Sequence, residues 1–104
     1  MQLLTKEIKK KLVSNHEAQD GTKKFKAVVK LFNPTGVGTW YLSELNPKTN
    51  TAFGLCCIHE EELGYVDLNE LLSFKGMMGL GIERDKFFTP KPLEECRTWV
   101  RKIS

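Results

Sequence analysis

Near the start of the chain, apolar side chains recur every four residues. Leu4, Ile8 and Leu12 lie on one stripe of a helix, and Thr5 is a suitable N-cap for that helix. Residues 14–22 are polar and contain an Asp-Gly pair, which is typical of a turn. The pattern therefore predicts a short N-terminal helix followed by a polar loop.

From residue 24 onward the period of the pattern shortens from four to two, which indicates strands. Alternation predicts a strand over 24–32, and the segment 39–45, flanked by turn-forming residues, predicts a second. Residues 51–59 are apolar on both faces and predict a central third strand. In 24–32, one face is predicted to hold Phe25, Ala27, Val29 and Leu31, and the other Lys24, Lys26, Val28, Lys30 and Phe32. Because the connections are short, the three strands predict an antiparallel meander.

A helix-starting signal follows the meander. Asp67 and Glu70 form a capping box, which predicts a helix over 68–75 that ends at Gly76. Residues 63–66, just before the capping box, predict a short fourth strand.

The last part of the chain predicts a short strand near 84–88 and then a final helix. Pro92 suits the first turn of that helix, and an apolar stripe that includes Trp99 runs through 93–103. Together the elements predict an α+β fold, in which an antiparallel sheet of about four to five strands forms a meander with two or three helices packed mainly on one side. The 104 residues are expected to form a single domain over 1–104.

Two aromatic residues, Trp40 and Tyr41, are neighbours in the second predicted strand. Neighbours in a strand point to opposite faces of the sheet, so at most one ring faces a given layer. One face of this strand is predicted to hold Trp40, Leu42 and Glu44, and the other Thr39, Tyr41, Ser43 and Leu45. Because both faces are amphipathic, either ring could be inside. Either one ring is exposed beside Lys26 and Lys30 as part of a binding surface, or the sheet is covered on both sides and the functional surface lies elsewhere, first of all in the loop 76–85.

The net charge of +3 is unevenly distributed along the chain. Residues 1–30 carry +5, residues 31–85 carry −5, and residues 86–104 carry +3. A basic patch is expected if the two ends meet in the fold. Three cysteines, two of them adjacent, argue against a disulfide framework. With no apolar run long enough for a bilayer span or a signal peptide, we expect a cytoplasmic protein without a membrane partner.

The basic residues of the first strand define one candidate binding surface. Lys24, Lys26 and Lys30 are predicted to share a strand face, and Trp40 or Tyr41 on the next strand would lie beside them. Lysines with exposed rings on a sheet face can hold phosphates and stack bases. The alternative is that a helix covers this face or that the lysines only solvate an edge strand.

The candidates for catalysis are weaker. Cys57 and His59 are two residues apart on a predicted strand face, where a thiol and an imidazole can form a nucleophile–base pair or bind zinc. Glu60, Glu61 and Glu62 are candidate acid–base groups, although such a run is more often solvated loop. No complete metal or nucleotide motif accompanies them, so the sequence predicts no catalytic residue, no metal and no cofactor. Arg84, within the Ile82–Asp85 segment of the loop 76–85, is a further candidate binding residue.

Several short motifs, in their order along the chain, resemble a known family. They are Trp40 and Tyr41 with Glu44, then Glu62-Leu63-Gly64-Tyr65 followed by Leu68, Glu70 and Leu71, then Ile82-Glu83-Arg84-Asp85 with Phe88 and Pro90. The chain resembles domain of unknown function family 2958 over about residues 3–93, with the predicted C-terminal helix at 93–103 less typical of it. The resemblance implies a bacterial protein encoded on mobile genetic elements, often near DNA-processing genes, and it implies no catalytic residues.

Three functional hypotheses follow. The first is a non-enzymatic accessory protein of a mobile element that binds a protein partner through its sheet face or the loop 76–85. The second is a nucleic-acid-binding protein that uses Lys24, Lys26 and Lys30. The third is a small enzyme that uses Cys57, His59 or the Glu60–Glu62 acids. The sequence predicts no oligomeric state.

Overall fold

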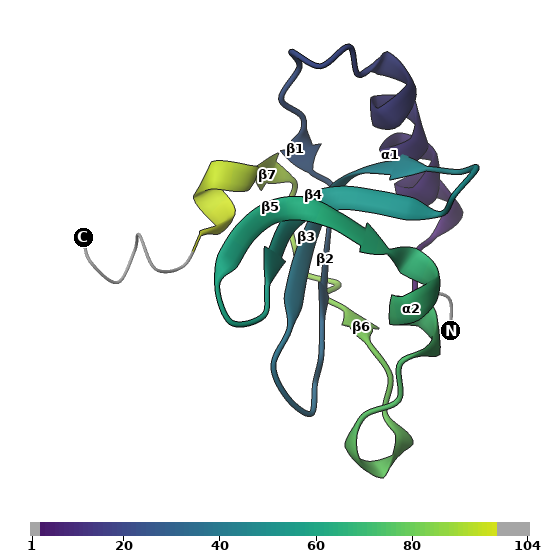
Figure 1. Cartoon of the computed structure of the whole chain (residues 1–104), viewed down its shortest axis with the longest axis vertical. Coiled ribbons are helices and arrows are strands. Elements are labelled where there is room, and N and C mark those ends of the chain that lie inside the picture. Colours follow the sequence, from purple (N-terminus) through teal and green to yellow (C-terminus); the bar gives the residue numbers. More distant parts are fainter. Residues whose placement is uncertain (1–2, 98–104) are drawn as a thin grey trace.

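A computed structural model of the chain describes residues 3–97 (Figure 1). Its elements are, in chain order, α1 (Lys6–Ala18), β1 (Lys26–Ala27), β2 (Val29–Phe32), β3 (Thr39–Asn46), β4 (Thr51–Cys57), β5 (Glu61–Asp67), α2 (Leu68–Ser73), the 3₁₀ turn η1 (Met77–Gly79), β6 (Glu83–Arg84), β7 (Lys91–Pro92) and the 3₁₀ turn η2 (Leu93–Cys96). No helix in residues 3–97 combines the length and apolar character that crossing a bilayer requires.

The main sheet has five antiparallel strands in the order β5-β4-β3-β2-β6. Strands β2 to β5 form the predicted meander, and β6 returns to pair with the outer edge of β2. The two short strands β1 and β7 form a separate pair beside it. The predicted α+β fold class is thus confirmed, with a small second sheet that the sequence did not predict.

One face of the sheet packs against the two α-helices. Thr5 caps α1 as predicted, because its hydroxyl accepts a hydrogen bond from the backbone N of Ile8 at 3.1 Å. The apolar stripe of α1 then meets the face of β3 that carries Trp40, whose ring is buried there. This first cluster consists of Leu12, Val29, Leu31, Trp40, Leu42, Leu45, Ala52, Leu68 and Leu71. Figure 1 shows α1 and α2 on the same side of the sheet.

The opposite face is covered by the segment that runs from β6 through β7 to η2 (Figure 1). Its buried residues are Ala27, Tyr41, Leu55 and Cys96, with Phe88 and Leu93 packed against them. The ring of Phe88 lies 5.8 Å from that of Tyr41, centroid to centroid. The sheet is therefore covered on both sides, which is the second of the two alternatives for the Trp40-Tyr41 pair.

A β-bulge interrupts β3 at Ser43. Leu42 pairs with Gly54 and Glu44 with Phe53, so one extra residue lies on β3 at this point. The bulge reverses the faces of the residues after it, because side chains alternate along a strand. Leu45 joins Leu42 in the first cluster. The predicted face of Trp40, Leu42 and Glu44 is therefore wrong at Glu44.

Two predictions for the first third of the chain are corrected. Helix α1 continues to Ala18 through the first half of the predicted loop 14–22, because Asn15 is buried and its Nδ2 donates to the Ser43 carbonyl at 2.9 Å. The predicted strand 24–32 divides at Val28. Residues before it pair with β7 and residues after it pair with β3, so the predicted face splits between the two clusters.

Smaller corrections concern element ends. The predicted strand 51–59 ends at Cys57, and α2 ends at Ser73 although its predicted cap is present, with Asp67 accepting from the backbone N of Asn69 at 2.8 Å. The predicted strand 84–88 is replaced by β6 and a turn, because Asp85 starts that turn. Of the predicted helix 92–103, the described part is η2, and residues 98–104 lie outside the described residues.

Candidate binding site

The structure separates the residues that the sequence placed on one binding surface. Trp40 and Tyr41 are each 7% exposed, so neither ring is available for stacking. Lys30 lies on the Tyr41 face, with its Nζ 5.7 Å from the centroid of that ring. Lys24 and Lys26 are exposed near β7 and line a different groove. The lysines that were predicted to share one face therefore line two separate surfaces, one with Lys30 and the other with Lys24 and Lys26.

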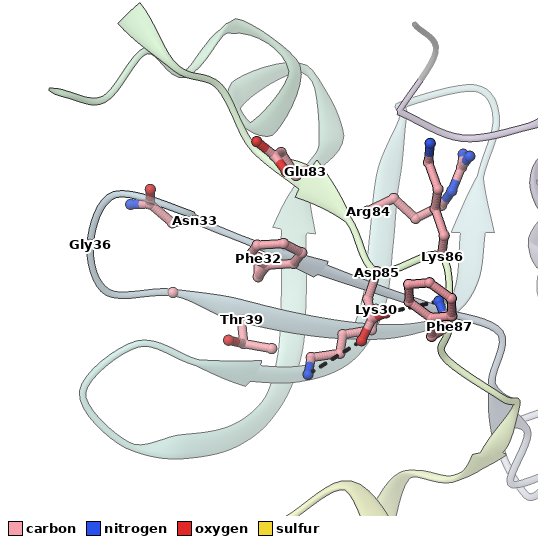
Figure 2. A pocket seen from close by; sticks show the side chains of 11 residues that line it. Lys30, Phe32, Asn33, Gly36, Thr39, Glu83, Arg84, Asp85, Lys86 and Phe87 are labelled. Atoms are coloured by element: carbon pink, nitrogen blue, oxygen red, sulfur yellow. Dashed lines mark hydrogen bonds and ion pairs between the residues drawn. The ribbon is translucent and has the colours of Figure 1, made fainter. Parts of the chain in front are cut away.

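The first groove, which we call the hairpin groove, lies between the β2–β3 hairpin and β6 (Figure 2). Its volume is about 620 Å³. The side chains that matter for its chemistry are Lys30, Phe32, Thr39, Glu83, Asp85 and Phe87. Lys30, Phe32 and Thr39 come from the face of β2 and β3 that the C-terminal segment leaves uncovered at this end.

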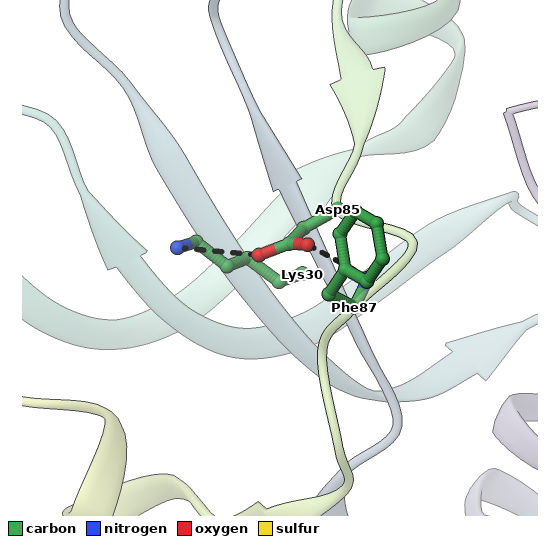
Figure 3. Close-up of polar contacts among 3 residues, drawn as sticks. All are labelled: Lys30, Asp85 and Phe87. Atoms are coloured by element: carbon green, nitrogen blue, oxygen red, sulfur yellow. Dashed lines mark hydrogen bonds and ion pairs between the residues drawn. The ribbon is translucent and has the colours of Figure 1, made fainter.

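Asp85 is held in the hairpin groove by contacts of both its side chain and its backbone. Its carboxylate lies 3.7 Å from Nζ of Lys30 and accepts a hydrogen bond from the backbone N of Phe87 at 2.9 Å (Figure 3). Its backbone N donates to the Lys30 carbonyl at 2.9 Å. A further bond from the Phe88 N to the Asp85 carbonyl closes the turn. The turn over residues 85–88 is thus fixed to β2 by both backbone and side-chain contacts.

This turn presents one aromatic ring to solvent. Phe87 is 95% exposed, while its neighbour Phe88 packs on Tyr41. Lys86, between Asp85 and Phe87, is also exposed. Arg84, a predicted binding residue, lines the same groove, and its Nη1 donates to the Leu3 carbonyl at 2.9 Å. The hairpin groove therefore offers an exposed aromatic ring on a fixed turn, with cationic side chains beside it.

A second groove, which we call the lysine-rimmed groove, lies over the other end of the same sheet face. Its volume is about 670 Å³. Glu44, only 8% exposed, lines it together with Phe53, Leu63 and Tyr65 from β4 and β5. The exposed lysines Lys23, Lys24 and Lys26 stand around it. Sequence reasoning noticed Glu44 and Tyr65 only within the family motifs, and it placed Glu44 on the wrong face because the bulge at Ser43 has no sequence signal.

The residues predicted for thiol chemistry do not form a reactive pair. Strand β4 ends at Cys57, so His59 lies in the following turn and is exposed. Burial, reinforced by the nearby Glu61 carboxylate, raises the pKa of the Cys57 thiol to about 11. A catalytic thiol requires the opposite shift, since the thiolate is the nucleophile.

The acidic run is also dispersed. Glu61 and Glu62 are consecutive in β5, so they point to opposite faces, and Glu60 lies in the preceding turn. The Cys57 Sγ approaches Glu61 Oε2 at 3.9 Å. Across the part of the chain that the structure describes, no three His, Cys, Asp or Glu side chains are grouped in a way that holds a metal ion.

The fold and its two grooves define a small α+β protein built on a five-stranded antiparallel sheet, with an open groove at each end of one sheet face. The chain belongs to the family described as Protein of unknown function (DUF2958), whose model matches residues 3–102. The match continues past Leu93, where the resemblance was expected to weaken. No curated protein and no solved structure matches the chain.

Proposed function

We propose that this chain is a non-enzymatic accessory protein that binds a protein partner through the turn over residues 85–88 and the hairpin groove. The observation that carries the proposal is the ring of Phe87, which is 95% exposed on a turn fixed to the sheet. Large aromatic side chains dominate the binding energy of protein interfaces, and they do so in the centre of the contact.

The rigidity of the turn supports a binding role. A partner that takes up Phe87 would not need to order a mobile loop, because Asp85 already holds the turn through Lys30 and the Phe87 backbone. Lys86 stands next to the ring and is exposed. The partner that fits is therefore a protein with an apolar pocket for the ring and acidic side chains at the rim of that pocket.

The setting is part of the proposal and rests on the family resemblance alone. Proteins of this kind are expected on bacterial mobile elements, so the partner is sought among proteins of the same element or of its host. The hypothesis of a small enzyme is the weakest of the three, because the pKa of Cys57 is raised and the acidic run is divided between two faces.

The test is a capture experiment with matched variants. A photo-crosslinking amino acid at position 86 is placed in the wild-type chain, in Phe87→Ala and in Leu72→Ala, a change at another exposed apolar residue that lies on α2. We expect one partner to crosslink to the wild type and to Leu72→Ala and to be lost with Phe87→Ala. With that partner purified, Phe87→Ala should weaken binding by about tenfold or more. Equal capture by all three chains would contradict the proposal.

A further inference from the structure

The lysine-rimmed groove contains a carboxylate without a cationic partner. Glu44 accepts one hydrogen bond, from Nε2 of Gln19 to its Oε2 at 2.9 Å. Within residues 3–97 no Lys, Arg or His nitrogen lies within 4.0 Å of this carboxylate. A charge this far out of water is costly unless hydrogen-bond donors surround it. Glu44 is therefore suited to a ligand that brings N–H groups into the groove.

Gln19 fixes the direction in which Glu44 points. Its Nε2 also donates to the Lys23 carbonyl, and its Oε1 accepts from the backbone N atoms of Gly21 and Lys23. All these bonds fall between 2.9 and 3.1 Å. The amide is thereby held by the loop after α1, so it presents the carboxylate in one orientation.

An aromatic surface lies directly beside this carboxylate. Glu44 pairs with Phe53 across β3 and β4, and Phe53 pairs with Tyr65 across β4 and β5, so the three side chains form one row on one face. The two rings are 5.1 Å apart, centroid to centroid, and tilted by 57°. Tyr65 is 76% exposed, and Leu63 beside it is 53% exposed. A flat ring can therefore stack on Tyr65 with its edge toward Glu44.

Three lysines surround the row. Lys23 and Lys26 are exposed, and the side chain of Lys24 is 91% exposed. The pairing of Lys24 with Glu94 at 4.0 Å is open to solvent on both sides, so a stronger anion can replace it. The groove thus has lysines at its rim, where the exposed Glu94 also lies, and the buried carboxylate of Glu44 inside. This arrangement suits a ligand with an anionic backbone and a neutral ring that donates hydrogen bonds.

We propose that the lysine-rimmed groove binds one nucleobase of a single-stranded nucleic acid. The base stacks on Tyr65, its amino and imino N–H groups donate to Glu44, and the flanking phosphates lie against Lys23, Lys24 and Lys26. Guanine fits best, because its N1–H and N2–H are adjacent and match the two oxygens of a carboxylate. A basic peptide satisfies Glu44 but is repelled by the three lysines, so charge complementarity favours the nucleic acid.

The test is an anisotropy titration with labelled heptamers of DNA and of RNA at low salt. One heptamer contains only thymine or uracil, a second has a central guanine, and a third has a central hypoxanthine, which lacks the N2 amino group. We expect the guanine heptamer to bind about tenfold more tightly than the other two, and all binding to weaken as salt increases.

Variants separate the contributions. Glu44→Gln should remove the preference for guanine while leaving the salt dependence unchanged, and Tyr65→Ala should weaken all heptamers by about tenfold or more. Tyr65→Phe keeps the ring and should restore binding. Phe87→Ala lies in the other groove and should bind like the wild type, so this test does not depend on the proposed protein partner.

Three results would overturn the inference. The first is no binding of any heptamer at tens of micromolar at low salt. The second is binding that neither Glu44→Gln nor Tyr65→Ala changes, since this would place the nucleic acid elsewhere. The third is tighter binding of an oligolysine peptide than of the guanine heptamer, because the groove would then be a site for cationic peptides.

Discussion

The rings of Trp40 and Tyr41, adjacent in the chain, lie in two hydrophobic clusters on opposite faces of one sheet. Each is 7% exposed. The helices α1 and α2 cover Trp40, and the segment that ends in η2 covers Tyr41. Each ring therefore packs a different covering layer against β3, and both rings contribute to stability rather than to ligand contact.

The first prediction concerns the buried Trp40. Trp40→Ala should lower the free energy of unfolding by about 3–5 kcal/mol, because it leaves a cavity between α1 and the sheet. Urea denaturation measures the change. Val37→Ala, at a residue 60% exposed in the β2–β3 turn, is the control and should change stability by no more than about 0.5 kcal/mol. A loss below about 1 kcal/mol for Trp40→Ala would be inconsistent with this packing.

The second prediction uses two glycines that are paired across β4 and β5. An added Cβ at Gly54 would overlap the Tyr41 carbonyl and meet the Leu42 Cα at 2.8 Å, whereas at Gly64 it meets nothing within 4 Å. Because backbone atoms cannot move aside cheaply, Gly54→Ala should destabilise the protein by about 3 kcal/mol or more. Gly64→Ala should be neutral or slightly stabilising. Thermal melting of both variants checks this, and equal effects would contradict it.

The third prediction concerns the thiol of Cys57. Burial and Glu61 raise its pKa to about 11, against an ordinary value of 9.0. The variant Cys56→Ser leaves Cys57 as the one thiol on β4. In this variant, alkylation of Cys57 between pH 7 and 9 should be slower in the folded protein than in urea. Glu61→Gln should lower the pKa and speed alkylation. Because the folded-state pKa is the higher one, the related stability is complete below pH 9 and is lost as the pH rises toward 11. Equal alkylation rates for Cys57 in folded and unfolded chains would refute the shift.

The fourth prediction concerns the pair that holds the turn over residues 85–88. Lys30 and Asp85 are 3.7 Å apart, and both side chains are about 30% exposed. A double-mutant cycle with Lys30→Met and Asp85→Asn should give a coupling energy of about 0.5–1 kcal/mol that falls as salt is added. Asn at 85 keeps an oxygen for the Phe87 backbone. A coupling of zero at low salt would show that the turn does not depend on this pair.

Local signals in the sequence predicted much of the fold. Thr5 and Asp67 each cap a helix as expected, since the cap bond is made within three residues of the capping side chain. The meander also followed from local patterning and short turns. What failed depended on distant partners. β1 leaves the meander because it pairs with β7, about 65 residues later, and α1 extends because Asn15 bonds to the Ser43 carbonyl.

The candidate sites were harder to predict for the same reason. Lys30 and Arg84, both predicted from the sequence as binding residues, line the hairpin groove, but the ion-pair partner of Lys30 is Asp85, which lies 55 positions away in the chain. The sequence could not show that Phe87 is exposed, because Phe88 next to it is the same residue type and yet is packed on Tyr41. Glu44 was expected on the Trp40 face, and only the bulge turns it into the groove.

The bulge at Ser43 acts as a frame shift within a strand. Before the bulge, the even-numbered residues Trp40 and Leu42 face the two α-helices, and after it the odd-numbered Leu45 does so. Deleting Ser43 would leave a regular ladder, with Glu44 still opposite Phe53 and Leu45 still in the interior, whereas a strand that kept Ser43 without the bulge would turn Glu44 into the interior and Leu45 out into the groove. The bulge therefore sets which of Glu44 and Leu45 faces the groove, and no single substitution makes that exchange without also moving the backbone.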